Sequence, residues 1–530
     1  MNARRRMLLG SVLTLPFAKL AQGADPLGPL TPRQRQRLVF DRRREAAQAQ
    51  FDDAPLAPSS NGDEDRYPDR RASFSKTMPH DDLGEVDSAA YRQWLAILGS
   101  GDPAQFDRAP RDPRAVERLN DPQAAYALDL IGPDALPLPP PPTFASQAAA
   151  AEMAELYWLA LMRDMPFCDY ATNSLASAAA ADLRAAGFVV DSASLFRSEA
   201  DGDRRGPFVS QFLWQDVPFG LKTVEQRFRV PLQGQNFLTR FNTWLACQRG
   251  ARSAETLRID PEPRYITNYR ALTEFVHRDF SFQAFMDAAL IVLRMGGDEV
   301  LSPTNPYRGS RTQFGDITFG NKNLLSMLAQ ASLLAQKVSY YQKWRVHRRA
   351  RPEVIGGRID VHLSGRKSYD IHRAILNSEG LARTKAANGS WLLPLAYTEG
   401  CPTHPSYPAA HAVNAGACAT VLKAFLDERY AIQHPVQASA DGTSLEPWGG
   451  EALLVGGEID KLASNIALAR DAAGVHFRSD SVEGLKLGEA VGTGLLADYS
   501  RTYNEHFDGF SLTRFDGRRV LIANGAVDEG

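Results

Sequence analysis

Features that would point directly to a common function are scarce in this chain of 530 residues. Its four cysteines, Cys168, Cys247, Cys401 and Cys418, show neither a Cys-x-x-Cys pair nor zinc-finger spacing. One or two disulfides are compatible with them, and no pairing follows from their positions. The 60 basic and 62 acidic side chains leave a formal net charge of −2, without the basic field on which nucleic-acid-binding proteins depend. Zinc modules and nucleic-acid partners are therefore not expected.

Long hydrophobic runs are also missing, because no stretch reaches the roughly 18 apolar residues that a membrane span requires. A shorter apolar segment follows three arginines at residues 4–6 and extends to about residue 20. Small residues then occur where a signal peptidase would cleave. We predict a signal peptide over residues 1–23, of the twin-arginine type, and an exported protein that is periplasmic or secreted. A disordered basic tail is the alternative.

Strand-like alternation is scarce, and no period of about 20–50 residues repeats. Apolar residues instead recur every three or four positions, as in amphipathic helices. The segments with this pattern are residues 90–98, 146–165, 171–187, 233–250, 269–297 and 322–349. Short strands are expected mainly within residues 206–232. The pattern predicts a mainly α fold built as helical bundles, with two four-helix-bundle-like cores and few short strands.

The region between the signal peptide and the helical segments is rich in charge and proline. We predict a charged, proline-rich N-terminal arm over residues 24–85 and an all-α domain over residues 86–530. Within the arm, residues 33–50 (RQRQRLVFDRRREAAQAQ) favour a short charged helix. Residues 58–71 (PSSNGDEDRYPDRR) are typical of an exposed linker. The arm would wrap the core or a neighbouring subunit, and a solvated tail is the alternative.

The stretch 401–422 (CPTHPSYPAAHAVNAGACATVL) is the central motif of the sequence. Prolines 405 and 408 tighten the backbone before a small-residue run that predicts a helix extending to about residue 425. The amides of residues 409–411 would then point outward, where they and the helix dipole favour an anion. His411 lies beside this site as a titratable group. A buried helix start with an incidental histidine is the alternative.

A second segment, residues 343–352, ends a long predicted helix with Lys343, Arg351 and Pro352. Proline disfavours helical geometry in the residue before it, so the helix should end at Arg351. The guanidinium of Arg351 would then be free to bind an oxyanion through its planar fork. A solvated basic helix end is the alternative, because Arg345, Arg348 and Arg349 lie nearby.

A third segment, residues 465–480, has an apolar helix that should stop near Gly474, a residue type that accepts a left-handed cap. His476 would follow on a loop, while Arg470 stays on the helix. Asp480, four residues after His476, could accept a hydrogen bond from Nδ1 and leave Nε2 free as a nucleophile or metal ligand. An ordinary arginine–aspartate pair near a helix end is the alternative.

Together the three segments supply one lysine, two arginines, helix-start amides and two histidines. A trigonal, multiply charged oxyanion needs such a set: cations and amides neutralise its equatorial oxygens, one histidine binds the central atom, and the other moves a proton.

These segments resemble those of vanadium-dependent haloperoxidases of the algal and bacterial bromoperoxidase type, a family that shares its oxyanion pocket with acid phosphatases. The resemblance rests on KWRVHRRARPEVIGG, EGCPTHPSYPAAHA and ARDAAGVHFRSD. It extends upstream through FSKTMPHDDLGEVD, AEMAELYWLALMRDMPF, GPFVSQFL and NPYRGSRTQFGDITFG, and so covers most of the chain beyond residue 70. The spacer of seven residues between Lys343 and Arg351 matches the haloperoxidases better than the phosphatases.

The resemblance implies a role for each matching residue. Vanadate would be the cofactor, with vanadium coordinated by His476. The residues implied to bind the vanadate are Lys343, Arg351, Ala409, Ala410, Arg470 and His476. His411 would be the acid/base residue, and His404 a catalytic histidine on the halide side. Asp480, Tyr340 and Trp344 are expected around this set, and an ordinary core aromatic is the alternative for Tyr340.

One departure from the family pattern concerns its Ser-Gly-His motif, which is Ala409-Ala410-His411 here. The serine hydroxyl that would bind a vanadate oxygen is absent. A hydrogen bond to a charged group contributes about 1.5–3 kcal/mol, so vanadate affinity is expected to fall by an order of magnitude or more unless another donor replaces it.

The implied reaction is the oxidation of halide, bromide or iodide, by hydrogen peroxide to a hypohalous-acid equivalent that halogenates a small organic acceptor. The resemblance also implies a homo-oligomer, dimer or larger. Some members of the family bind a structural calcium ion in the loop that matches residues 305–316, where Asp316 is the candidate ligand. The alternatives are an acid phosphatase that forms a phosphohistidine on His476, and an exported non-catalytic homologue.

Overall fold

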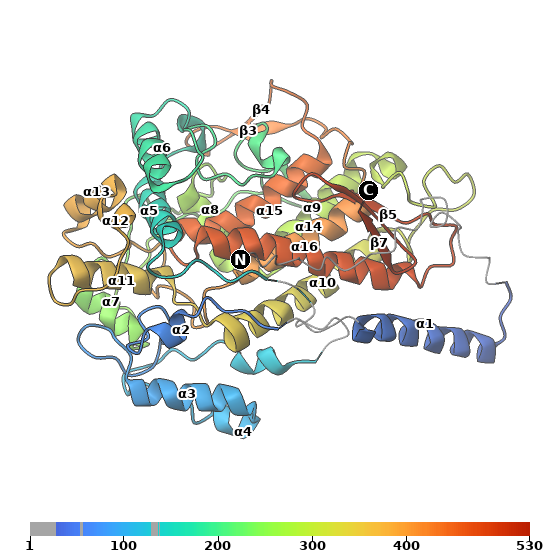
Figure 1. The fold of residues 1–530 in the computed structure, drawn as a ribbon. Coiled ribbons are helices and arrows are strands. Elements are labelled where there is room, and N and C mark those ends of the chain that lie inside the picture. Colours follow the sequence, from blue (N-terminus) through green and yellow to red (C-terminus); the bar gives the residue numbers. More distant parts are fainter. Residues whose placement is uncertain (1–27, 53–56, 129–135, 137, 530) are drawn as a thin grey trace, which may run out of the picture.

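The computed structural model describes residues 28–52, 57–128, 136 and 138–529, so the predicted signal peptide lies outside the described residues. Helices dominate these residues and strands are few and short, which confirms the mainly α prediction (Figure 1). Among the described helices, none has the length and apolar content to cross a membrane. The α-helices are α1 (Pro32–Asp52), α2 (Asp63–Arg66), α3 (Ser88–Ser100), α4 (Pro103–Phe106), α5 (Gln147–Met162), α6 (Ser174–Ala186), α7 (Phe241–Gln248), α8 (Tyr269–Arg278), α9 (Gln283–Met295), α10 (Asn321–Tyr341), α11 (Pro352–Leu363), α12 (Arg373–Leu376), α13 (Glu379–Asn388), α14 (Ala410–Phe425), α15 (Val455–Ala472) and α16 (Arg478–Ser500).

The described residues also form three small antiparallel sheets. The strands are β1 (Val217–Phe219), β2 (Lys222–Val224), β3 (Val436–Ala438), β4 (Leu445–Pro447), β5 (Phe510–Thr513), β6 (Arg519–Ala523) and β7 (Ala526–Glu529). The β1–β2 hairpin lies within the residues predicted for short strands, whereas β3–β4 and the meander β5–β6–β7 were not predicted. In the meander, Phe510 pairs with Ile522 and Val520 pairs with Glu529. Strands of three to five residues are too short for their alternation to emerge from the sequence.

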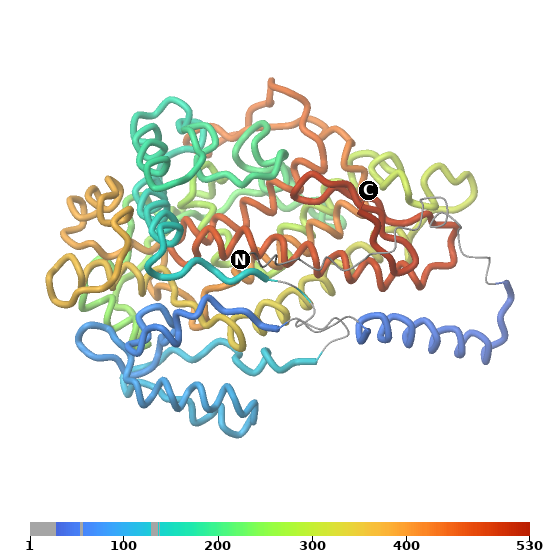
Figure 2. Tube along the Cα trace, viewed as in Figure 1, coloured from blue at the N-terminus to red at the C-terminus, as the bar shows by residue number. Residues whose placement is uncertain are grey.

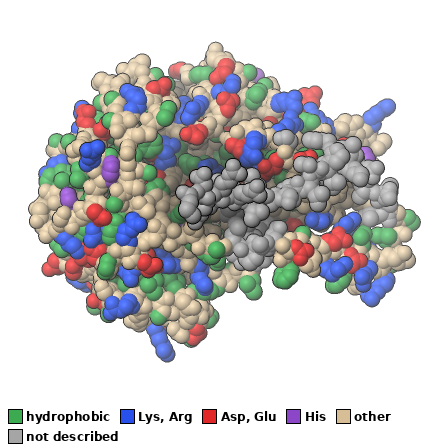
Figure 3. All heavy atoms as spheres, in the orientation of Figure 1, with side chains coloured by type: hydrophobic (Ala, Val, Ile, Leu, Met, Phe, Trp, Pro, Cys, Tyr) green, Lys and Arg blue, Asp and Glu red, His purple; other side chains and the backbone are tan. Residues whose placement is uncertain are grey.

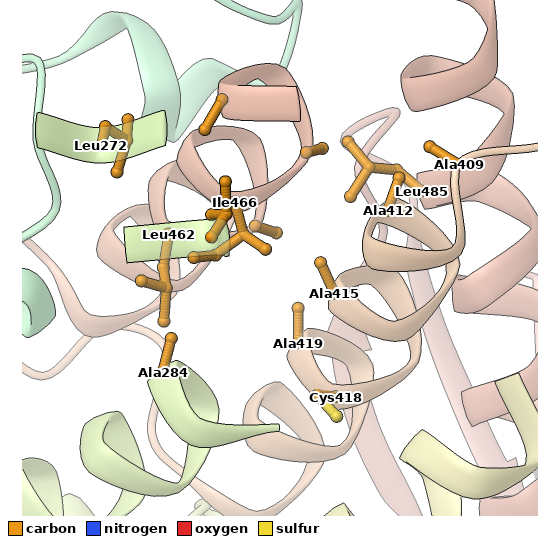
Figure 4. Close-up of a cluster of buried hydrophobic side chains, with 14 of the residues drawn as sticks. Leu272, Ala284, Ala409, Ala412, Ala415, Cys418, Ala419, Leu462, Ile466 and Leu485 are labelled. Atoms are coloured by element: carbon orange, nitrogen blue, oxygen red, sulfur yellow. The ribbon is translucent and has the colours of Figure 1, made fainter. Parts of the chain in front are cut away.

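Helix α14 lies at the centre of the larger helical group, where α9, α10, α15 and α16 pack around it (Figures 1 and 4). A second group is formed by α5 with α6, α12 and α13. Every residue of α14 except His411 is buried, as expected for a helix that carries alanine, glycine, valine and leucine on all sides. The predicted end of this helix, near Phe425, is confirmed. The fold thus leaves a single partly exposed side chain on its central helix.

Glycines allow α14 and α16 to approach closely. A Cβ atom added to Gly416 would clash with the carbonyl oxygen of Leu485, and one added to Gly488 would clash with that of Val413. Small residues therefore bring the two backbones together along α14. This packing holds the N-terminus of α14, and with it His411, against the start of α16.

The long helix predicted over residues 322–349 is interrupted. Helix α10 ends at Tyr341 and a π-helical segment, η8 (Gln342–His347), follows before Arg348 adopts a left-handed conformation with φ 41°. Arg351 is extended, as predicted, but Pro352 occupies the first turn of the new helix α11 instead of ending the incoming one. Proline suits that position because its missing N–H has no intrahelical partner there. The prediction that the helix ends at Arg351 was therefore wrong by several residues.

The predicted linker at residues 58–71 is only partly exposed. Asp63 and Tyr67 are buried, and the backbone amide of Phe74 donates a hydrogen bond to the carbonyl oxygen of Arg348 at 2.8 Å. The N-terminal segment therefore lies beside the gold-coloured residues that follow α10, as the tube shows (Figure 2). The interpretation as an exposed linker was wrong here, because its charged and aromatic residues are satisfied by partners distant in sequence. Helix α1, by contrast, has no buried residue.

The four cysteines are all free thiols. Cys168 is exposed, whereas Cys247, Cys401 and Cys418 are buried at separate places. Burial raises the pKa of Cys247 to about 12, so this thiol is protonated near neutral pH.

Replacing Gly488 with alanine is expected to lower the free energy of unfolding by about 1–3 kcal/mol, because the new methyl group overpacks the α14–α16 contact. Urea unfolding measures the change. Gly99→Ala is the matched control: Gly99 lies in α3 with open space around it, so alanine should stabilise the protein by about 0.5–1 kcal/mol. Equal unfolding midpoints for the two variants would contradict the close-packing argument.

Candidate functional site

A cavity of about 370 Å³ opens where the N-terminus of α14 meets the end of α15 and residues 397–404. Six residues predicted for the site line it: Tyr340, His404, Ala410, His411, Arg470 and His476. These residues come from α10, α14, α15 and the loops beside them. The structure therefore brings residues of segments 401–422 and 465–480 to one cavity, whereas Lys343 and Arg351 of segment 343–352 do not line it.

His476 lies just beyond α15, and its surroundings define which ring nitrogen carries the proton. Nδ1 is 2.9 Å from Oδ2 of Asp480, which confirms the predicted hydrogen bond. Because a carboxylate only accepts, Nδ1 is the donor. Nε2 is 2.9 Å from Nη1 of Arg351, and a guanidinium only donates, so Nε2 presents a lone pair. Burial and the charge of Arg351 hold the pKa of His476 well below its ordinary value, which keeps the ring neutral.

The structure therefore differs from the prediction that Nε2 of His476 would be free. The fork of Arg351, predicted to be free to bind an oxyanion, likewise already has protein acceptors. Arg351 is fully buried and also donates from Nε to the carbonyl oxygen of His404 and from Nη1 to that of Val475, each at 2.8 Å. The physical reason is that buried donors are costly unless they have acceptors. Its positive charge nevertheless lies directly against two histidines of the cavity, His404 and His476.

Lys343 is a second buried basic residue behind the cavity wall. Its Nζ donates to the carbonyl oxygens of Pro405 and Ser406 at 2.9 and 2.8 Å. Burial and the nearby charge of Arg351 lower the pKa of Lys343 well below its ordinary value. An anion in the cavity would favour the charged form of this amine, so Lys343 and an oxyanion stabilise each other.

The carboxylate of Asp480 joins the three segments. Oδ1 accepts from Nη1 of Arg349 at 2.7 Å, and Oδ2 accepts from His476, from the hydroxyl of Ser406 and from the amide of Phe477. Arg349 also forms an ion pair with Glu152 at 2.9 Å. The backbone oxygen of Asp480 accepts from the amide of Ala409 at 2.9 Å, so that amide does not point freely outward as predicted.

His411 is the only α14 side chain that reaches the cavity while partly exposed. Its Nε2 is 3.1 Å from Oδ1 of Asp279, which lies in the break between α8 and α9. The carboxylate side chain is 4% exposed and that of His411 is 27% exposed. In the neutral ring, the carboxylate accepts from Nε2 and Nδ1 is the nitrogen with a lone pair. This arrangement suits a group that accepts a proton from a molecule in the cavity.

Arg470 lines the cavity from the last turn of α15. Its Nη1 donates to the carbonyl oxygen of Val276 at 2.9 Å and to the hydroxyl of Tyr397 at 3.3 Å. Its Nε is buried without a hydrogen-bond partner among the described residues. A buried guanidinium N–H without an acceptor is costly, so this donor suits an anion in the cavity.

The aromatic residues predicted near the site separate into two groups. Tyr340 lies against His404, with ring centroids 5.4 Å apart, and lines the cavity, so both its predicted role and its alternative as a packed aromatic remain compatible with its position. Burial raises the pKa of Tyr340 to about 12. Trp344 instead packs edge-to-face against Phe74 and Trp94 in the neighbouring apolar cluster.

The sequence reasoning missed Arg349, Ser406, Asp279 and Lys76. Arg349 was named only in the alternative of a solvated basic helix end, and the fold shows that it meets two carboxylates. Lys76 is buried at the cavity, where it pairs with Glu353 at 3.2 Å. The segment that contains Lys76 was part of the upstream resemblance, and that resemblance was the sequence signal that could have identified this lysine. Asp279 follows a histidine and an arginine in a helical pattern, so its inward orientation gave no sequence signal.

Asp316, the candidate calcium ligand, pairs with Nζ of Lys322 at 2.5 Å. Across the described residues, no group of three or more histidine, cysteine, aspartate or glutamate side chains is arranged to hold a metal ion.

Three comparisons relate this chain to known proteins. The family model for the second helical-bundle domain of VCPO matches residues 369–505. A vanadium-dependent bromoperoxidase of Ascophyllum nodosum is 35% identical over 529 residues, covering 93% of each chain, and one of Corallina pilulifera is 31% identical, covering 92% of this chain and 98% of the other. The solved homohexameric structure of the second vanadate-dependent bromoperoxidase of Ascophyllum nodosum superposes with a TM-score of 0.88 at 28% identity, over 100% of this chain and 97% of that one.

Replacing Asp480 with asparagine is expected to lower the free energy of unfolding by about 3 kcal/mol, because Arg349 loses a buried partner charge. Chemical denaturation measures the loss. Asp316→Asn removes the same charge from an exposed ion pair and should cost less than about 1 kcal/mol. A similar, small loss in both variants would show that Asp480 does not hold the segments together.

Proposed function

Because this chain belongs to the vanadium-dependent bromoperoxidases, we propose that its cationic cavity holds vanadate, with His476 as the ligand of vanadium. The protein is a peroxidase that oxidises halide with hydrogen peroxide, and bromide is the halide for which its relatives are named. The observation that carries the site assignment is the neutral His476 ring, whose Nε2 lone pair lies among cations.

The donor set fits a multiply charged oxyanion. Arg470 contributes a buried Nε–H without a protein acceptor among the described residues, and Lys343 and Arg351 add positive charge from behind the wall. Attraction between opposite charges is several-fold stronger in such a partly dry site than in water. We assign Lys343, Arg351 and Arg470 to the vanadate oxygens, with the wall at Ala409 and Ala410 beside them.

When bound, vanadate supplies a Lewis acid that activates hydrogen peroxide toward halide without a change in the metal's oxidation state. The chain itself positions and neutralises charge and moves protons. Asp279 holds Nε2 of His411, so Nδ1 accepts the peroxide proton and later returns it. Asp480 holds Nδ1 of His476 and keeps Nε2 unprotonated. His404, facing Arg351 and Tyr340, is assigned to the halide side of the cavity.

We further propose that the protein is a homo-oligomer that is exported. A hexameric relative that matches the whole chain supports assembly. Helix α1 supports it too, because Phe40 and Phe51 are 57% and 80% exposed on a helix with no buried residue. Export rests on the arginines and apolar residues that precede residue 24, and a small organic acceptor is expected for the oxidised halide.

Bromination of a phenol with peroxide and bromide is expected only after orthovanadate is added to the stripped protein. His476→Ala should lower the rate more than about a hundredfold, because even partners of a metal ligand are worth about 10–100-fold. His506→Ala, at an exposed histidine, is the control and should retain activity. Cleavage of a phosphate ester that vanadate inhibits, without any halogenation, would instead support an acid phosphatase.

Replacing Ala409 with serine is expected to tighten vanadate binding about tenfold, because the hydroxyl adds a hydrogen bond to a charged group. Ala409 is the N-cap of α14 and lacks a capping side chain. Equilibrium dialysis with orthovanadate gives the dissociation constant. Ala419→Ser, deeper in the same helix (Figure 4), is the control and should leave the constant unchanged. Weaker binding by Ala409→Ser would mean that the cavity wall there is too tight for a hydroxyl.

A further inference from the structure

The guanidinium of Arg470 is held asymmetrically. Its Nη1 donates to two neutral acceptors, the carbonyl oxygen of Val276 and the hydroxyl of Tyr397, while its Nε has no partner among the described residues. A guanidinium has one plane and a fixed fork of donors, so anchoring one nitrogen restricts where the others point. The orientation of Arg470 therefore depends on the two groups that anchor Nη1.

Tyr397 is suited to anchor a cation because its own hydroxyl proton is committed elsewhere. The hydroxyl donates to the carbonyl oxygen of Thr273 at 2.7 Å, so its lone pairs are available to Arg470. The guanidinium carbon is also 5.5 Å from the centroid of the tyrosine ring. Burial raises the pKa of Tyr397, so the hydroxyl is neutral and keeps this bonding pattern near neutral pH.

The ring of Tyr397 is itself clamped. His277 stacks on it with centroids 3.9 Å apart and planes 12° from parallel. The ring nitrogens of His277 contact two carboxylates, Nε2 with Glu399 at 2.7 Å and Nδ1 with Glu274 at 3.2 Å. Glu274 lies on α8 and Glu399 on the loop that carries Tyr397, so the histidine joins these two walls of the cavity.

We propose that Tyr397 is a positioning residue that, clamped by His277, holds Arg470 so that its Nε–H faces the cavity. The proposal rests on the assignment of Arg470 to a vanadate oxygen. Without the tyrosine hydroxyl, Nη1 keeps only the carbonyl oxygen of Val276, and the fork is free to turn about that single anchor. The cavity then retains its charge but loses the direction of one donor.

Tyr397→Phe is expected to raise the dissociation constant of orthovanadate about tenfold, measured by equilibrium dialysis with the full-length stripped protein. The matched control is Tyr269→Phe. Tyr269 is buried, and its hydroxyl also donates to a backbone carbonyl, that of Phe196 at 2.9 Å, but it does not line the cavity. The control variant should bind vanadate as the parent does. Equal affinity in Tyr397→Phe and the parent would overturn the proposal.

A double-mutant cycle separates positioning from general stability. If Tyr397 acts through Arg470, Tyr397→Phe should have no further effect on vanadate affinity in an Arg470→Gln background. Additive losses would contradict the proposal, because they would mean that Tyr397 acts independently of the arginine. If Arg470→Gln alone binds vanadate with the affinity of the parent, the assignment of Arg470 to the anion is wrong. That outcome is distinct from one in which Arg470→Gln weakens binding and Tyr397→Phe does not, which overturns only the role of Tyr397.

Discussion

The site depends on one buried carboxylate. Asp480 accepts hydrogen bonds from Arg349, Ser406, His476 and the amide of Phe477, and these donors belong to three separate stretches of sequence. An ionised carboxylate away from water is very costly unless such donors surround it. These hydrogen bonds connect the three stretches to one another. The cavity is consequently a product of the whole fold and not of any single motif.

The buried carboxylate is accompanied by an accumulation of basic side chains around the cavity. Lys343 and Arg351 are fully buried, and Arg470 is nearly so. Burial of like charges opposes folding, and their backbone carbonyl partners compensate only in part. Elsewhere, basic and acidic side chains are interspersed over the surface, as the face in Figure 3 shows.

Sequence reasoning succeeded where a local rule was sufficient. The helix that starts at Ala410, the loop position of His476 and its bond to Asp480 follow from glycine, proline and a four-residue spacing. Sequence reasoning failed where the partners are distant in sequence. Arg349 pairs with Glu152, nearly two hundred residues earlier, and His411 pairs with Asp279, which lies in the break between α8 and α9. The π-helical segment at Gln342–His347 was missed because helical periodicity does not distinguish it from α-helix. Long-range contacts of this kind leave no pattern in a single sequence.

The contacts of Arg351 also determine which ions the cavity excludes. Four histidines line the cavity, and neutral imidazole is ordinarily a strong ligand for Zn²⁺ and Cu²⁺. Here one guanidinium nitrogen covers the lone pair of His476 and another faces His404 at 3.0 Å. A divalent cation would have to displace a fixed cation and then remain beside two others, whereas an anion is attracted by all three. The contacts of Arg351 therefore favour an anion over a divalent metal cation beside these two histidines.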